Sequence, residues 1–217
     1  MKLKILFIVS IFIIFFLCYN QISIDKTKTL PFYNSEEFTP QWISQSDPNY
    51  TKIHTIASFE FTNQNGKKIT NKELEGKIYI ADFFFTTCPS ICPILAKNMG
   101  SLQEIYKQDE NILLLSHSVM PWVDSVSKIK EYALEQKVID TKWHLVTGDR
   151  ESIYNIARNS YFADEDYKKT KDELEFIHTE NFILVDKKGR IRGVYNGTLA
   201  LDIQRLQRHI ELLKLEY

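Results

Sequence analysis

The 217-residue sequence predicts one three-layer α/β domain that follows an apolar N-terminal segment. Strand-like runs and helical stripes alternate along the body of the chain, with one hairpin pattern near its start and another near its end. Hydrophobic residues make up 44% of the chain and there are only 7 Gly and 6 Pro, which favours a packed core over disorder or repeats. The 27 Lys and Arg nearly balance the 28 Asp and Glu, so the charge gives no footprint for nucleic acid.

The first twenty residues predict a single transmembrane helix. Lys2 and Lys4 lie at the start of an apolar stretch in which only Ser10 interrupts the run from Ile5 to Leu17. Counted from Leu3 to Tyr19, the stretch reaches about 17 residues, near the lower limit for a helix that spans a bilayer. No small-residue cleavage site follows, which favours an uncleaved anchor over a removed signal peptide, with a lipidated Cys18 as a third interpretation. Because the lysines lie at the start of this stretch, we expect the rest of the chain outside the cytoplasm. The segment is too short and too poor in Arg for a mitochondrial presequence, which favours a bacterial cytoplasmic membrane with the domain on its periplasmic side.

The chain beyond this segment divides into a linker and one domain. Residues 21–50 are polar and proline-containing with no sustained period, which predicts a linker, although residues 31–33 could dock on the domain. We expect the domain to cover residues 51–217. It opens with a hairpin, because Asn65-Gly66 separates two short alternating runs.

The remaining elements alternate between buried strands and amphipathic helices. Apolar and β-branched runs predict strands at residues 78–85, 112–115, 143–146, 181–185 and 191–195. Apolar stripes with helical spacing predict helices after residue 93, from 126 to 133, from 150 to 159 and around residues 203–213. Asp124 or Ser125 could cap the second of these helices. The charge-dense residues 163–175 predict a solvated loop.

Cys88 and Cys92 lie where a predicted central strand turns into a helix. Free N–H groups at a helix N-terminus favour a thiolate and lower the thiol pKa. Four-residue spacing on a helix brings the two Cα atoms to about 6 Å, which suits a disulfide and equally suits two sulfurs on one soft metal ion. An inert structural disulfide is less favoured, because closing so short a loop removes little chain entropy. The pair therefore predicts a redox or metal-binding role.

Copper is the metal that best suits two thiolates and one imidazole. Zinc prefers four protein ligands, or three and a water, whereas cuprous copper accepts two or three soft ligands. His178, just ahead of the strand at 181–185, is the favoured third ligand, and His117, after the strand at 112–115, is the second choice. Met120 could add a thioether, although a loop methionine more often packs against its neighbours. We interpret the other histidines as structural or solvated: His54, His144 and His209.

Three segments of the chain resemble the SCO/SenC family: FFFTTCPSICP at residues 83–93, WHLVTG at 143–148, and His178 ahead of NFILVD. The resemblance covers roughly residues 50–217. It implies a thioredoxin-like fold with an N-terminal β-hairpin extension, attached to a membrane outside the cytoplasm.

The resemblance also implies a ligand set and a task. Copper, as Cu(I) or Cu(II), would be held by Cys88, Cys92 and His178. A membrane-anchored metallochaperone of this kind delivers copper to the dinuclear site of cytochrome c oxidase subunit II. Other implied partners are a periplasmic copper donor and a thioredoxin-like reductant.

Two positions differ from the pattern common in that family. Ile177 stands where many members have Asp directly before the histidine. Residues 116–124 read SHSVMPWVD where SIDPERD is usual, so we expect His117 and Met120 near the site. Asp124 matches an acidic position of the family loop.

An alternative function uses the same two cysteines without a metal. As a thiol-disulfide oxidoreductase, the protein would keep the copper-site cysteines of the oxidase reduced. Of Cys88 and Cys92, one thiolate would attack the partner's disulfide and the other would resolve the mixed disulfide. The sequence does not separate this enzyme from a metal-binding assembly factor.

Overall fold

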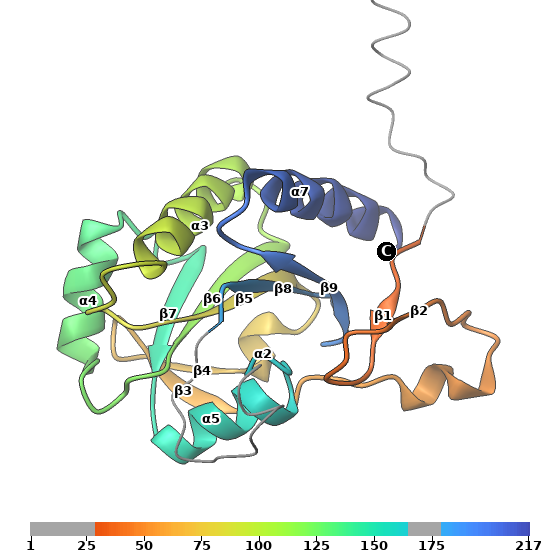
Figure 1. Ribbon diagram of the computed structural model, residues 1–217, viewed down its shortest axis with the longest axis horizontal. Coiled ribbons are helices and arrows are strands. Elements are labelled where there is room, and N and C mark those ends of the chain that lie inside the picture. The colour runs from red at the N-terminus through yellow and green to blue at the C-terminus, as the bar shows by residue number, and fades with distance from the viewer. Residues whose placement is uncertain (1–28, 165–178) are drawn as a thin grey trace, which may run out of the picture.

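The computed structural model describes residues 29–164 and 179–217 (Figure 1). The predicted membrane segment at residues 1–20, with Cys18, lies outside the described residues, as do His178 and most of the charge-dense run at 163–175. Among the helices that the structure describes, none is long and apolar enough to cross a bilayer.

The centre of the domain is a seven-stranded mixed sheet with the order β4-β3-β7-β6-β5-β8-β9. Strands β5, β6 and β7 run parallel, while the two outer hairpins pair antiparallel to them. The strands are β3 Glu60–Asn63, β4 Lys68–Thr70, β5 Ile78–Phe84, β6 Ile112–Ser118, β7 Trp143–Thr147, β8 Asn181–Val185 and β9 Ile191–Asn196. The predicted hairpins are confirmed, and Gly66 supplies the left-handed φ of +73° that the first turn requires.

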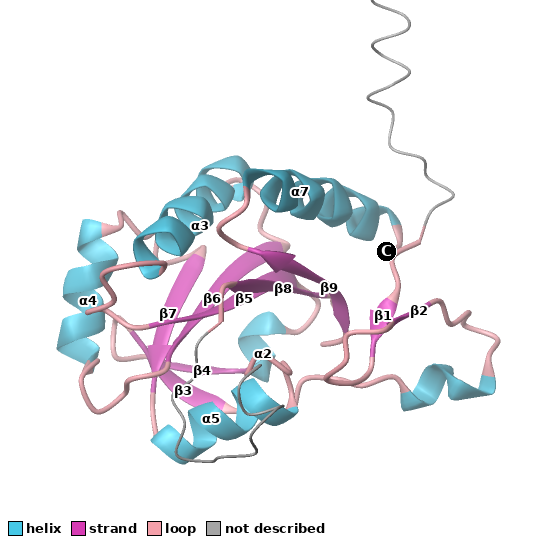
Figure 2. Ribbon diagram, viewed as in Figure 1, coloured by secondary structure: helices cyan, strands magenta, loops and turns pink. Residues whose placement is uncertain are grey.

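Helices cover both faces of the sheet, as the three-layer prediction requires (Figure 2). Helices α3 (Cys92–Tyr106), α4 (Val126–Glu135) and α7 (Ala200–Leu215) pack on one face, and α2 (Asn71–Leu74) and α5 (Arg150–Asn159) on the other. The stripe predicted for α3 is buried: Leu95, Met99, Leu102 and Tyr106. Ser125 rather than Asp124 caps α4, since its side chain accepts a hydrogen bond from the N–H of Lys128.

Strand β6 is longer than the sequence indicates, because three polar residues extend it to Ser118. Ser116 accepts a hydrogen bond of 2.8 Å from the indole N–H of Trp143, and Ser118 donates to Asp124. These partners satisfy the two serine side chains inside the core. The extension also decides where His117 points, since successive residues of a strand face opposite sides of the sheet.

The segment before the first hairpin is built into the domain. It forms the small β1–β2 pair (Phe32–Tyr33 and Pro40–Gln41) and the 3-10 helix η1 (Pro48–Lys52). The expected docking of residues 31–33 is seen at the buried guanidinium of Arg192, which donates to the carbonyl oxygens of Pro31 at 3.1 Å and Leu30 at 2.6 Å. The same guanidinium pairs with the carboxylates of Asp186 and Glu216.

Candidate functional site

The two cysteines lie at the point where β5 ends and α3 begins. Cys92 is the first residue of α3 and is buried, whereas Cys88 is half-buried in the turn before it. The N-cap residue of α3, Ile91, has no polar side chain to accept hydrogen bonds from the first turn. The backbone N–H of Cys92 instead donates to Sγ of Cys88, with an N···S distance of 3.5 Å. The first N–H group of α3 thus points at the sulfur of Cys88.

This contact separates the acidities of the two thiols. Partial burial alone would raise the pKa of Cys88, but the hydrogen bonds from Cys92 and Ser90 outweigh it and lower the pKa to about 7. Burial raises the pKa of Cys92 to about 12, and the neighbouring Cys88 adds to the rise. Near neutral pH the accessible sulfur is therefore substantially a thiolate while the inner one keeps its proton.

A buried carboxyl group lies next to the inner thiol. Asp82 on β5 is 2% exposed and lines the same tightly packed space as Cys92, Ser116 and Tyr132. Its burial raises the pKa to about 7, against the lowering effect of the Ser116 hydroxyl, and its Oδ1 has no hydrogen-bond partner among the described residues. Asp82 is not among the residues predicted from the sequence, although an aspartate inside an otherwise apolar strand run was the available signal.

The structure does not test the predicted third ligand. His178 lies outside the described residues, and the described parts of the chain hold no group of three or more His, Cys, Asp or Glu side chains placed to bind a metal. The next residue, Thr179, is buried just ahead of β8. Strand β8 pairs antiparallel with β5, with Ala81 opposite Ile183, so its first residues lie toward the end of β5 from which the cysteine turn leaves.

The expectation that His117 lies near the site is wrong. Its side chain projects from the face of the sheet opposite Cys92, where it is fully buried and stacks on Phe83 at 5.1 Å between ring centroids. Tyr161 and Phe61 complete the surroundings at 5.3 Å and 5.7 Å. Burial lowers the pKa of His117 to about 4, and neither ring nitrogen has a hydrogen-bond partner in the part of the chain that is described.

The other described histidines make structural contacts, in line with their interpretation as structural or solvated. His54 shares a 2.8 Å hydrogen bond with the carbonyl of Ser160, and His209 one of 2.8 Å with the hydroxyl of Tyr195. His144 is half-buried, and burial lowers its pKa. Met120 is half-buried in the loop after β6, where its carbonyl accepts from the N–H groups of residues 123 and 124.

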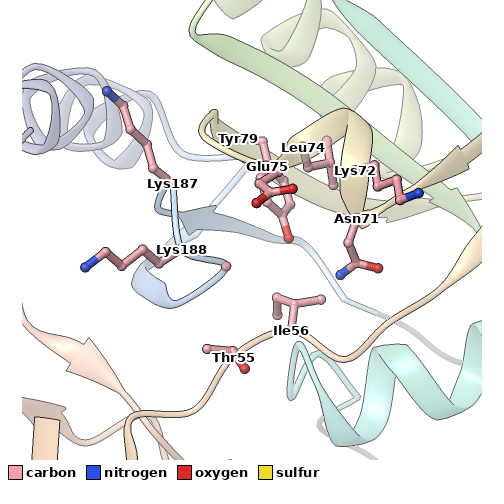
Figure 3. Close-up of a pocket in the computed structure, with 10 residues that line it drawn as sticks. Thr55, Ile56, Asn71, Lys72, Leu74, Glu75, Tyr79, Lys187 and Lys188 are labelled. Atoms are coloured by element: carbon pink, nitrogen blue, oxygen red, sulfur yellow. The ribbon is translucent and has the colours of Figure 1, made fainter. Parts of the chain in front are cut away.

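A separate pocket of about 370 Å³ opens between α2 and the β8–β9 turn (Figure 3). Tyr79 and Glu75 line it from one side and Ile56 from the other, but the ammonium groups of Lys187 and Lys188 point away from it. Its polar groups do not converge on a common point, and none of its residues belongs to the cysteine turn. The cysteine turn is therefore the better candidate site.

Known proteins share this fold and this stretch of sequence. The sequence model of the SCO1/SenC family matches residues 47–213, which is most of the chain. The chain belongs to the SCO1/SenC family. The SCO1 protein homolog of Bacillus subtilis is 33% identical over 146 residues, covering 66% of this chain and 75% of that protein. The thioredoxin-like α/β architecture predicted from the sequence is the one these proteins have.

Two solved structures relate the fold to chemistry. BsSco, described as a member of the Sco family of cytochrome c oxidase assembly proteins with a disulfide switch, superposes with a TM-score of 0.63 at 29% identity, covering 74% of this chain and 94% of BsSco. ScoI of Arabidopsis thaliana, solved with copper bound, gives a TM-score of 0.53 at 25% identity, covering 74% of this chain and 98% of ScoI. Relatives of this chain thus include a copper-bound protein.

Proposed function

We propose that this protein is a membrane-anchored copper metallochaperone for the assembly of cytochrome c oxidase. Its cargo is one copper ion, Cu(I) or Cu(II), bound by the thiolates of Cys88 and Cys92 and the imidazole of His178. The observation that carries the proposal is the geometry of the turn, in which the N–H of Cys92 reaches Sγ of Cys88. The recipient is the dinuclear copper site of cytochrome c oxidase subunit II.

The donor set suits copper as a cargo. Two sulfurs one helical turn apart are soft ligands, and a single imidazole leaves the coordination number low, as cuprous copper accepts. Cys88 is partly exposed, so a ligand of the recipient can reach the metal while Cys92 still holds it. Stepwise exchange of one ligand at a time then moves the ion without releasing it to water. Cys92 must lose its proton when the metal binds, so loading releases protons.

We place this task outside the cytoplasm. Residues 1–20 anchor the chain in the bacterial cytoplasmic membrane, and the domain lies on the periplasmic side. Copper reaches it from a periplasmic donor.

The test is made in cells that lack the chromosomal copy of the gene and carry the full chain or its His178→Ala variant. We expect the absorbance of the dinuclear copper centre in the oxidase to fall with His178→Ala and to persist with His144→Gln, a histidine of β7. Added copper should restore the centre in the deletion strain. A His178→Ala strain with a full complement of the copper centre would contradict the three-ligand proposal.

A second function is favoured by the unequal acidities of the two thiols. In a thiol-disulfide oxidoreductase, the Cys88 thiolate attacks one sulfur of the partner's disulfide, and the first partner thiolate leaves. Cys92 then transfers its proton to Asp82 and attacks Sγ of Cys88, which releases the second partner thiolate and leaves a Cys88–Cys92 disulfide. A thioredoxin-like reductant restores the dithiol. This function predicts that a small-molecule dithiol, rather than added copper, restores the oxidase in the deletion strain.

A further inference from the structure

The loop after β6 turns back to hold the loop after β5. These strands are parallel neighbours whose last registered pair is Phe84 with Ser118, and beyond this pair each strand continues into its own loop. Asp124, in the loop after β6, connects the two loops by hydrogen bonds to Thr86. Its Oδ1 accepts a 2.6 Å hydrogen bond from the hydroxyl of Thr86, and its Oδ2 accepts one of 3.2 Å from the backbone N–H of the same residue.

The carboxylate of Asp124 is fully buried, and its recorded partners all come from the ends of these two strands. The third donor is the hydroxyl of Ser118, at 2.6 Å from Oδ2. No Lys or Arg side chain among the described residues pairs with it, so neutral donors alone compensate the buried charge. Short hydrogen bonds of this kind are charge-assisted and directional. Asp124 therefore fixes the position of Thr86 more tightly than an exposed side chain would.

Thr86 lies at the start of the turn that carries Cys88, just after the end of β5. Two residues further on, the backbone N–H of Cys88 donates to the carbonyl of Phe85 at 3.3 Å. Sγ of Cys88 then meets the N–H of Cys92 at the start of α3. A displacement of Thr86 is passed along this short turn to the outer sulfur, whereas Cys92 is held independently by the helix.

We propose that Asp124 is a positioning residue, which acts through Thr86 to hold Sγ of Cys88 at its working distance from Cys92. The inference rests on the proposed function in one respect, namely that the two cysteines act as a pair. Partners that orient ligands without touching the metal commonly change metal affinity by about 10- to 100-fold when they are removed. A positioning role through hydrogen bonds predicts a loss of this size for Asp124→Asn.

The test uses the full reduced chain and Cu(I) in competition with a chromophoric chelator. Thr86→Val keeps the shape of the side chain but lacks the hydroxyl, and it should lower the affinity by about tenfold. Thr86→Ser restores the donor and should bind nearly as the wild type does. Ser125→Ala is the matched control from the same loop: it removes the cap of α4, and it should lower the melting temperature without changing the affinity.

A second readout on the metal-free protein separates this inference from the proposed function. The thiolate is the species that iodoacetamide attacks, so losing the contact with the Cys92 N–H should slow alkylation of Cys88 at pH 7 by roughly fivefold in Thr86→Val. Thr86→Ser should restore the rate. If the wild type does not bind Cu(I) tightly, the copper proposal fails and alkylation alone decides on Asp124. If Thr86→Val and Asp124→Asn match Ser125→Ala in both readouts, Asp124 is merely structural and the inference is overturned.

Discussion

Replacing His117 by phenylalanine should stabilise the domain. The imidazole is fully buried against Phe83, Phe61 and Tyr161, so a phenyl ring finds aromatic surfaces on several sides. Both imidazole nitrogens lack a hydrogen-bond partner among the described residues. A buried polar group without a partner costs about 1–3 kcal/mol. At pH 7 we therefore expect His117→Phe to raise the free energy of unfolding by about 1–3 kcal/mol.

The same substitution should change how stability depends on pH. In the folded protein burial lowers the pKa of His117 to about 4, while an unfolded histidine titrates near 6.5. Between these values the unfolded chain binds the proton more strongly, so His117 lowers stability as the pH falls from about 6.5 to about 4. The loss is about 1.4 kcal/mol for each pH unit in this window. His117→Phe removes this contribution, so its advantage should grow toward pH 4.

The assay is urea unfolding of the full chain at several pH values between 4 and 8. The difference between wild type and variant isolates His117, because the other histidines titrate equally in both. His54→Phe is the control, since it removes a hydrogen bond to Ser160 and should destabilise the domain. A His117→Phe protein that is less stable than wild type at pH 7, or whose advantage stays constant down to pH 4, would refute the reasoning.

Three further predictions follow from the packing and the thiol environment. Alkylation of Cys88 should follow an apparent pKa of about 7, well below that of Cys92. Mass spectrometry of protein treated with iodoacetamide at a series of pH values measures both rates. Equal pH profiles for the two cysteines would contradict the role of the helix N-terminus. Arg192→Met should cost roughly 1–3 kcal/mol in urea unfolding, because the carbonyl oxygens of Leu30 and Pro31 lose their donor, whereas Asp186 keeps its ion pair with Arg190. It should also speed proteolysis near residue 30, and an unchanged cleavage rate would argue against the docking of that segment. Gly197→Ala should cost about 1–3 kcal/mol, since its Cβ would lie 2.7 Å from neighbouring side chains, whereas Gly100→Ala in α3 meets nothing and should stabilise by about 0.5–1 kcal/mol.

The sequence predicts most of the fold because its periodic patterns and its turns agree. The stripe from Leu95 to Tyr106 could only be buried as a helix, and Gly66 marked the first hairpin by its need for a positive φ. The end of β6 was predicted too early, because polar residues usually mark the end of a strand. Ser116 and Ser118 remain in the sheet since a tryptophan and an aspartate supply their partners from elsewhere in the chain.

The candidate site also contains some residues that the sequence predicts and others that it does not. The cysteine pair was predictable, because the strand–turn–helix context is local and visible in the order of residues. Asp82 was not singled out because its strand run is apolar on both faces, and His117 was expected in a loop because the strand before it was predicted to end at residue 115. Asp124 illustrates the third case, since the contact to Thr86 joins two loops that are distant in the sequence.

The proposal that the cysteine pair binds copper is tested most directly by titrating Cu(I) into the full reduced chain under anaerobic conditions, against a chelator of known affinity. We predict one tightly bound equivalent in the wild type and in Cys18→Ser, the control for the third cysteine. The equivalent should be lost in Cys88→Ser. A wild-type protein that binds copper no more tightly than Cys88→Ser would contradict the metallochaperone and leave dithiol exchange as the function of the pair.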